Sequence, residues 1–147
     1  MPRIRTGFSF RTAAGTLPAV MDRLIECGYG YAPITDRAST FGWVKWDKLC
    51  REKDIKPVFG VELAVSQDIT AKRPIADYWT FIAQDSVQPI NKLVEMATDQ
   101  FRYQPLLSYE QAQAATGVSK IVGSCSDLDL IDATSKDLYI GLSPSCA

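Results

Sequence analysis

The sequence predicts an α/β fold built on a mainly parallel sheet. Short apolar stretches of strand length alternate with stretches whose apolar residues recur at the 3.6-residue spacing of a helix. The run Lys56–Val65 is apolar almost throughout, as strands covered on both faces are. With 147 residues, 46% of them hydrophobic and 22% charged, the chain suits one packed domain over residues 1–147.

The first half of the chain is expected to alternate strand and helix twice. Thr16 stands where an N-cap belongs, a proline follows in the first turn, and Gly28 stops the apolar spacing. The expected elements are a strand over Arg3–Phe10, a helix from Leu17 to Gly28, a strand over Tyr31–Thr35 and a helix over Trp43–Lys53.

The second half continues the alternation. Ser108 and Gln111 have the spacing of a capping box, which predicts a fourth, short helix. The pattern gives strands over Lys56–Val65, Tyr78–Ala83, Lys120–Gly123 and Leu138–Leu142, a polar loop or hairpin tip over Gln67–Asp77 and a helix opened by Gln88-Pro89. Right-handed crossovers would join the parallel strands, and periodicity leaves open both an open sheet and part of a barrel.

Composition excludes several classes of function. The chain has no histidine, which rules out Ser-His-Asp and Cys-His catalysis and any metal centre with histidine ligands. A net charge of −1 indicates that direct binding of nucleic acid is weak or absent. No export signal or long apolar run is seen, so we expect a cytoplasmic protein that does not cross a membrane and whose four cysteines are reduced.

Two carboxylates are candidates for chemistry. Glu62 interrupts an apolar strand, where it either pairs with Arg5 or Arg37 or serves as a metal ligand or acid/base group. Asp36 follows a predicted strand, the place where α/β folds put their sites. The alternative for Asp36 is a turn or a local cap.

Other features favour a structural role. Cys125 follows a strand and is either a small buried residue or a nucleophile that lacks a histidine base. The aspartates at 127, 129 and 132 lack the glycine and the final glutamate of a calcium loop. The three tryptophans are expected in the core, and the basic group Arg3, Arg5 and Arg11 is expected to be solvated or ion-paired, with phosphate contact as the alternative.

Five segments stand in an order that is informative as a set. They are Arg5-Thr6-Gly7-Phe8-Ser9-Phe10, Ala32–Gly42, Asp54–Val65, Tyr78–Asp85 and Val122-Gly123-Ser124-Cys125. This order resembles the PHP domain family (polymerase and histidinol phosphatase), in the form that opens bacterial DNA polymerase III alpha subunits. The resemblance is most specific over Ile34–Val65, and it implies a distorted β/α barrel that would here be partial, lacking the C-terminal part of a full PHP domain.

The resemblance also implies a lost metal site. Active family members hold three metal ions, mainly with histidines, for phosphoester hydrolysis. The former metal-site positions here would be Arg5, Gly7, Ala14, Arg37, Glu62, Tyr78 and Cys125. Only Glu62 and Cys125 keep a ligand type, so we expect no metal, no cofactor and no catalytic residue. Arg5 and Arg37 bring fixed positive charge, which predicts an ion-pair cluster of Arg5, Asp36, Arg37 and Glu62.

Three functions remain to be compared. The first is a non-catalytic module of a DNA polymerase III alpha-type protein, structural or docking to a replisome protein such as a proofreading exonuclease or a polymerase subunit. The second is a stand-alone protein, of phage or mobile-element type, that mimics the polymerase N-terminus. The third is a residual metal-dependent phosphoesterase that uses Asp36, Glu62 and Cys125.

Overall fold

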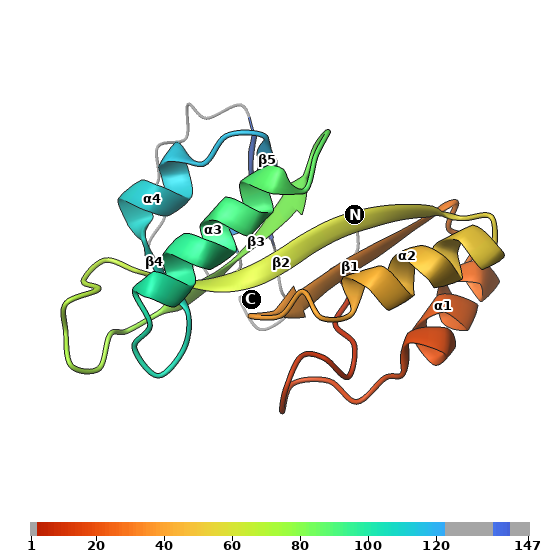
Figure 1. Ribbon diagram of the computed structural model, residues 1–147, viewed down its shortest axis with the longest axis horizontal. Coiled ribbons are helices and arrows are strands. Elements are labelled where there is room, and N and C mark those ends of the chain that lie inside the picture. Colours follow the sequence, from red (N-terminus) through yellow and green to blue (C-terminus); the bar gives the residue numbers. More distant parts are fainter. Residues whose placement is uncertain (1–2, 123–136, 142–147) are drawn as a thin grey trace. The chain divides into compact units, whose positions relative to one another are not determined.

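The computed structural model describes residues 3–122 and 137–141 of the chain. The chain divides into two compact units, Met1–Val61 and Glu62–Ala147, here called unit 1 and unit 2. Helices and strands alternate through most of the chain, as Figure 1 shows. The strands hydrogen-bond in the order β1-β2-β3-β5-β6, and β4 pairs with β2.

Unit 1 opens with an irregular segment and helix α1 (Leu17–Glu26). The Thr16 hydroxyl accepts a hydrogen bond from Ala19 N at 3.4 Å, and Pro18 lies in the first turn, so the predicted helix start is confirmed. Leu17, Met21 and Leu24 form the buried face. Burying each of these side chains stabilises the fold by roughly 2 kcal/mol.

Strand β1 (Tyr31–Arg37) and helix α2 (Trp43–Glu52) complete the core of unit 1, and Figure 1 shows α2 running along β1. The indole nitrogen of Trp46 donates to Ala32 O at 3.0 Å and fixes the helix on the strand. A Cβ atom on Gly42 would lie 3.0 Å from the Phe8 ring and 3.1 Å from Ile34, so the first turn of α2 sits close against both side chains. The core cluster consists of Leu17, Met21, Leu24, Ala32, Ile34, Trp46, Cys50 and Ile55.

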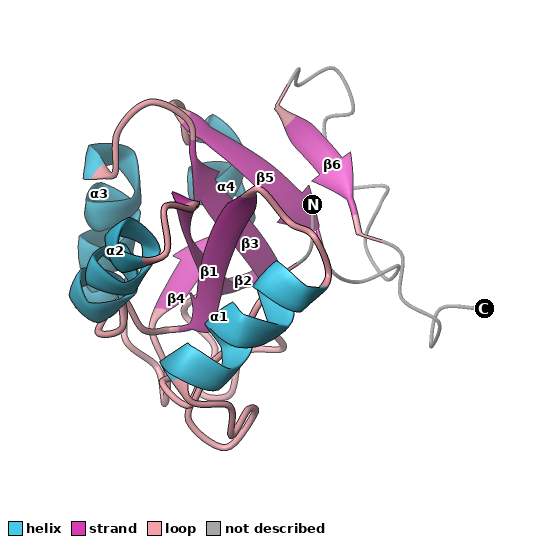
Figure 2. Cartoon of the chain, turned by 90° about the vertical axis from the view of Figure 1, so that its right-hand side faces the viewer, coloured by secondary structure: helices cyan, strands magenta, loops and turns pink. Residues whose placement is uncertain are grey.

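Strand β2 (Lys56–Ser66) confirms the predicted apolar strand, and every residue from Gly60 to Ser66 is buried. In unit 2 it is followed by β3 (Asp77–Ala83), β4 (Leu106–Ser108), β5 (Val118–Val122) and β6 (Leu138–Ile140). β3 pairs with β5 antiparallel, β5 with β6 parallel and β2 with β4 parallel. Figure 2 shows β3, β5 and β6 side by side.

Two helices cover strands of unit 2. Helix α3 (Gln88–Asp99) contacts β3 and β4 and buries Ile90, Leu93 and Ala97. Helix α4 (Tyr109–Ala114) begins at the predicted capping box: the Ser108 hydroxyl accepts from Gln111 N at 3.2 Å, and Gln111 Oε1 accepts from Ser108 N at 2.9 Å. The sequence pattern thus located both helix starts.

The structure differs from the predicted strands in three respects. Arg3–Phe10 is not a strand, because turns close over it: Ser9 N donates to Thr6 O and Thr12 N donates to Ser9 O. The three-residue strand β4 was not expected, since its pairing partner Ala64–Ser66 lies far away in the sequence. The sheet is mixed where a mainly parallel one was predicted, and the partial or distorted barrel stays a prediction.

Within the described ranges, the helices are all too short or too polar to cross a lipid bilayer.

Candidate functional site

A buried carboxylate lies near the end of β1. Asp36 is only 1% exposed, and three donors bind its two oxygens. Oδ1 accepts from Thr6 N at 2.6 Å and from the Ser9 hydroxyl at 2.5 Å, and Oδ2 accepts from the Thr6 hydroxyl at 2.8 Å. Burial of a carboxylate is tolerated when its lone pairs are satisfied in this way.

The same hydroxyls continue the network into the backbone. Ser9 Oγ accepts from Arg37 N at 2.9 Å, and Thr6 Oγ1 accepts from Phe8 N at 3.3 Å. On the other side of Thr6, Ile4 and Thr35 exchange hydrogen bonds through Thr35 Oγ1 and both main chains. Asp36 therefore anchors the irregular N-terminal segment to β1, a role that neither the turn nor the local-cap alternative described.

Thr6 and Ser9 were not singled out from the sequence. Both are fully buried, and their spacing lets one turn bring two hydroxyls to one carboxylate. The signal was present as two small hydroxyl residues beside the aromatic residues of a segment that also begins a family-like motif. Their pairing with Asp36, however, spans about 30 residues of sequence and depends on the fold.

The former metal-site positions of unit 1 carry no carboxylate. Arg5 and Arg37 are half-buried, and Gly7 and Ala14 lie at the surface. Gly7 takes part through its backbone, donating to Gly15 O at 2.7 Å. Glycine and alanine offer no side-chain ligand atom, and guanidinium groups repel cations.

Unit 2 contains Glu62 and Tyr78. Glu62 is 2% exposed, and Tyr78 donates its phenol hydrogen to Gln104 Oε1 at 2.9 Å. Because Glu62 belongs to one unit and Arg5, Asp36 and Arg37 to the other, the ion-pair cluster expected among them stays a prediction. Cys125 and the aspartates at 127, 129 and 132 lie outside the described residues.

The basic cluster expected near the N-terminus is divided in the structure. Arg3 and Arg5 line a hollow of about 560 Å³ beside α1, together with Arg23. Arg11 lies instead over the ring of Phe10, 5.4 Å from its centroid. The expectation of core tryptophans is confirmed for Trp46 and Trp79, which are fully buried, and Trp43 is half-buried against Phe59.

The residue set was tested against the metal cluster that the family resemblance implies. In residues 3–122 and 137–141, no three Asp, Glu or Cys side chains come together in a metal-binding group. Both oxygens of Asp36 already accept hydrogen bonds from protein donors, and the position after it carries an arginine. The described residues therefore do not fit that cluster.

Comparison with known proteins identifies the family. No curated protein sequence matches this chain. One solved structure among the matches is described as a "putative metal-dependent phosphoesterase" from Bifidobacterium adolescentis ATCC 15703, with 17% identity and a TM-score of 0.49. The match covers 66% of this chain and 32% of that one, so this chain spans about a third of its length. The sequence model of the PHP domain matches residues 2–139, nearly the whole chain, which therefore belongs to the PHP domain family.

Proposed function

We propose that this PHP domain is a non-catalytic module of a DNA polymerase III alpha-type protein, with a structural or protein-docking role in DNA replication. The polymerase assignment rests on the motif resemblance over Ile34–Val65. The proposed partner is a replisome protein such as a proofreading exonuclease or a polymerase subunit, and the proposed location is the cytoplasm.

One observation carries the non-catalytic part of the proposal. Asp36 immediately precedes Arg37, which stands at the motif position of a metal ligand. Both oxygens of Asp36 accept hydrogen bonds from Thr6 and Ser9. A metal ion at Asp36 would have to displace these donors from a buried carboxylate. A buried carboxylate satisfied by hydroxyl and backbone donors needs no cation to be stable.

The catalytic alternative can be tested directly. We expect purified protein to carry no stoichiometric metal by elemental analysis and to leave a chromogenic phosphodiester intact in manganese-supplemented buffer. The Glu62→Gln variant is the matched control, since it removes the charge of a former ligand and keeps the shape. Stoichiometric metal, or hydrolysis that Glu62→Gln abolishes, would overturn the proposal.

The docking role requires a different measurement. We expect the tagged chain to retain a proofreading exonuclease or polymerase subunit from bacterial lysate, identified by mass spectrometry. Resin loaded with the tag alone measures nonspecific retention. Each protein retained by the tagged chain must then bind the chain again when both are purified. Retention of unrelated proteins alone would contradict the replisome assignment.

A further inference from the structure

The small net charge of the chain hides a separation of charge between its two units. Unit 1 contains ten Lys and Arg residues and six Asp and Glu residues, a formal net charge of +4. Unit 2 contains six basic and eleven acidic residues, a net charge of −5. The total of −1 is therefore a poor guide to what unit 1 attracts, because surface charges act over about 8 Å in physiological salt.

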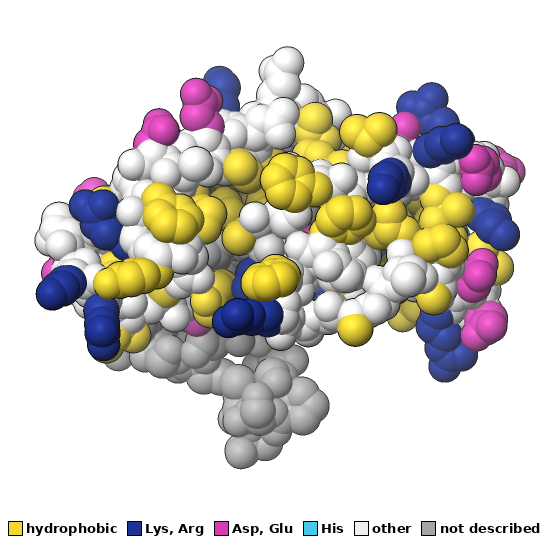
Figure 3. All heavy atoms as spheres, turned by 60° about the horizontal axis from the view of Figure 1, so that its bottom comes forward, with side chains coloured by type: hydrophobic (Ala, Val, Ile, Leu, Met, Phe, Trp, Pro, Cys, Tyr) yellow, Lys and Arg dark blue, Asp and Glu magenta, His cyan; other side chains and the backbone are white. Residues whose placement is uncertain are grey.

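Unit 1 also exposes large apolar side chains. Phe10 is 80% exposed, and Phe41 and Val44 are each 83% exposed. Figure 3 shows hydrophobic and basic side chains interleaved on the surface of the chain. We call the set Phe8, Phe10, Arg11, Phe41, Val44 and Lys45 the aromatic–basic set.

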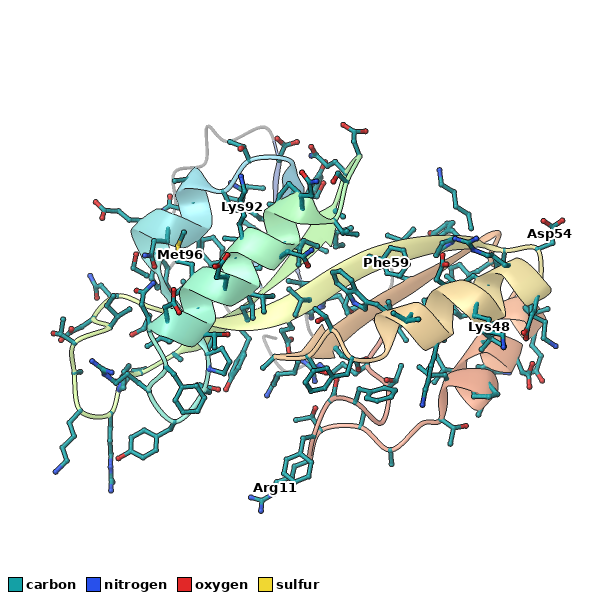
Figure 4. All side chains as sticks on the ribbon, viewed as in Figure 1. Arg11, Lys48, Asp54, Phe59, Lys92 and Met96 are labelled. Carbon is teal, nitrogen blue, oxygen red and sulfur yellow. The ribbon has the colours of Figure 1, made fainter. Side chains whose placement is uncertain are left out.

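Contacts place Phe8 of this set against the start of α2. The Phe8 ring packs on Gly42, the residue between Phe41 and the helix, and Lys45 Nζ lies 6.0 Å from the centroid of the Phe8 ring. Phe10 and Arg11 follow two and three residues later, and Figure 4 shows Arg11 at the tip of its loop, pointing away from the ribbon.

The loop that carries Phe8, Phe10 and Arg11 is held in place by hydrogen bonds to the buried Asp36 carboxylate. Asp36 binds Thr6 and Ser9 on either side of Phe8, and Thr12 N donates to Ser9 O at 3.0 Å. Arg11 has a φ of 61°, a left-handed conformation that is uncommon for arginine. The exposed side chains therefore stand on a loop anchored to a buried carboxylate, so little ordering would be needed for them to bind a ligand.

From the charge of unit 1 and these side chains, we propose that the aromatic–basic set binds single-stranded nucleic acid. Exposed rings stack on unpaired bases, and the neighbouring cations contact phosphates. The closest acidic group on α2 competes little, because Asp47 is paired with Arg51 at 2.8 Å. Duplex bases are already stacked, so exposed rings favour a single strand.

The probe is a fluorescein-labelled oligothymidylate of about 16 nucleotides, which suits the span of one small binding surface. Anisotropy of the full-length chain should show saturable binding that weakens between about 50 mM and about 200 mM salt. Oligouridylate of the same length distinguishes RNA from DNA, and a duplex of the same length should bind more weakly. Loss of one stacking ring in Phe10→Ala or Phe41→Ala should weaken binding about 5- to 100-fold.

Matched variants separate the aromatic–basic set from general effects. Phe101→Ala and Arg73→Ala change exposed residues of unit 2 and should leave the affinity unchanged. Arg11→Ala should lower the slope of log affinity against log salt by about 0.7, the effect of one lost phosphate contact on a single strand. Because Phe10, Arg11 and Phe41 are exposed, their truncation should not unfold the chain, which circular dichroism verifies.

The proposal fails if the chain does not bind the oligonucleotides, or if the unit 2 controls weaken binding as much as the Phe10, Arg11 and Phe41 variants. It also fails if these three variants instead abolish self-association or retention of a replisome protein, because the exposed rings would then serve a protein contact. These outcomes are independent of the metal and hydrolysis assays, which bear on the carboxylates alone.

Discussion

At the scale of single residues, Asp36 is the side chain on which the N-terminal segment depends. Asp36→Ala would leave Thr6 N and two buried hydroxyls without their acceptor, so we expect a loss of about 3 kcal/mol in the free energy of unfolding. Asp36→Asn keeps one acceptor oxygen, and a hydroxyl can rotate so that its oxygen accepts from the new amide N–H, so its cost should be smaller. Urea denaturation measures both.

Asp85→Asn provides the surface control, because Asp85 is exposed and its substitution should change stability by less than about 0.5 kcal/mol. If Asp36→Ala were no more destabilising than Asp85→Asn, the anchoring role would be wrong. The sequence identified Asp36 as important but not its function, since a carboxylate after a strand fits a turn, a cap and a site equally well.

Lys120 is a buried basic residue, at 3% exposure, with Nζ donating to Gln113 O at 2.6 Å. Burial lowers the pKa of its amine, and Asp137 partly opposes this. The pKa is therefore lower in the folded chain than in the unfolded one, so the cost of burial is present below the folded pKa. This cost disappears as pH rises through the folded pKa toward the unfolded value of 10.5.

Replacing Lys120 with methionine removes this titration. We expect the free energy of unfolding of the native chain to rise relative to Lys120→Met as pH increases through that alkaline window. Urea denaturation of both proteins over the same pH series gives the difference, in which the other titrating groups cancel. Lys92→Met, at an exposed position on α3, should show no such change, and an equally flat difference for Lys120→Met would contradict the assignment.

Two cysteines of unit 1 should differ in reactivity. Cys50 is fully buried, and burial, with Asp47 nearby, raises the pKa of its thiol to about 11. Because the thiolate is the reactive form, iodoacetamide at about pH 8 should label exposed Cys27 and spare Cys50 until denaturant is added. Peptide mass mapping separates the two sites, and equal labelling in the native chain would show that the core of unit 1 opens readily.

At the scale of elements, helix starts were the most predictable features because their signals are local. The cap of α1 and the capping box of α4 both involve residues three apart. Arg3–Phe10 was wrongly predicted as a strand and β4 was missed, because their structure depends on distant partners. The first segment is bound by Asp36 and Thr35, and β4 pairs with Ala64–Ser66. A local pattern cannot specify such pairings.

The two caps also allow a prediction about stability. Ser108 is half-buried and has reciprocal bonds with Gln111, whereas the Thr16 cap is exposed and its bond to Ala19 N is long at 3.4 Å. Ser108→Ala should therefore cost about 1 kcal/mol, and Thr16→Ala about half as much. Urea denaturation of the two variants measures the difference, and the reverse order would mean that cap geometry does not control these helix ends.

At the scale of the whole molecule, the sequence predicted alternating helices and strands but not how the strands pair. The antiparallel pairing of β3 with β5 makes the sheet mixed, although their apolar composition suits either direction. The former metal-site positions show a similar limit. Their order along the chain was readable, whereas the contacts of Asp36 with Thr6 and Ser9 required the fold.

The last prediction concerns metal and stability in the intact chain. A cation bound only by the native state at about 100 times its dissociation constant would raise the free energy of unfolding by about 2.7 kcal/mol. Because the described carboxylates and the arginines do not fit such a site, we expect the urea midpoint to be equal in chelator and in about 1 mM manganese. A manganese-dependent rise in the midpoint that persists in Glu62→Gln would reflect nonspecific surface binding. In the described residues, Glu62 is the only carboxylate at a former ligand position, and that variant lacks it. A rise that Glu62→Gln abolishes would instead show a metal at Glu62, and the non-catalytic proposal would have to be abandoned.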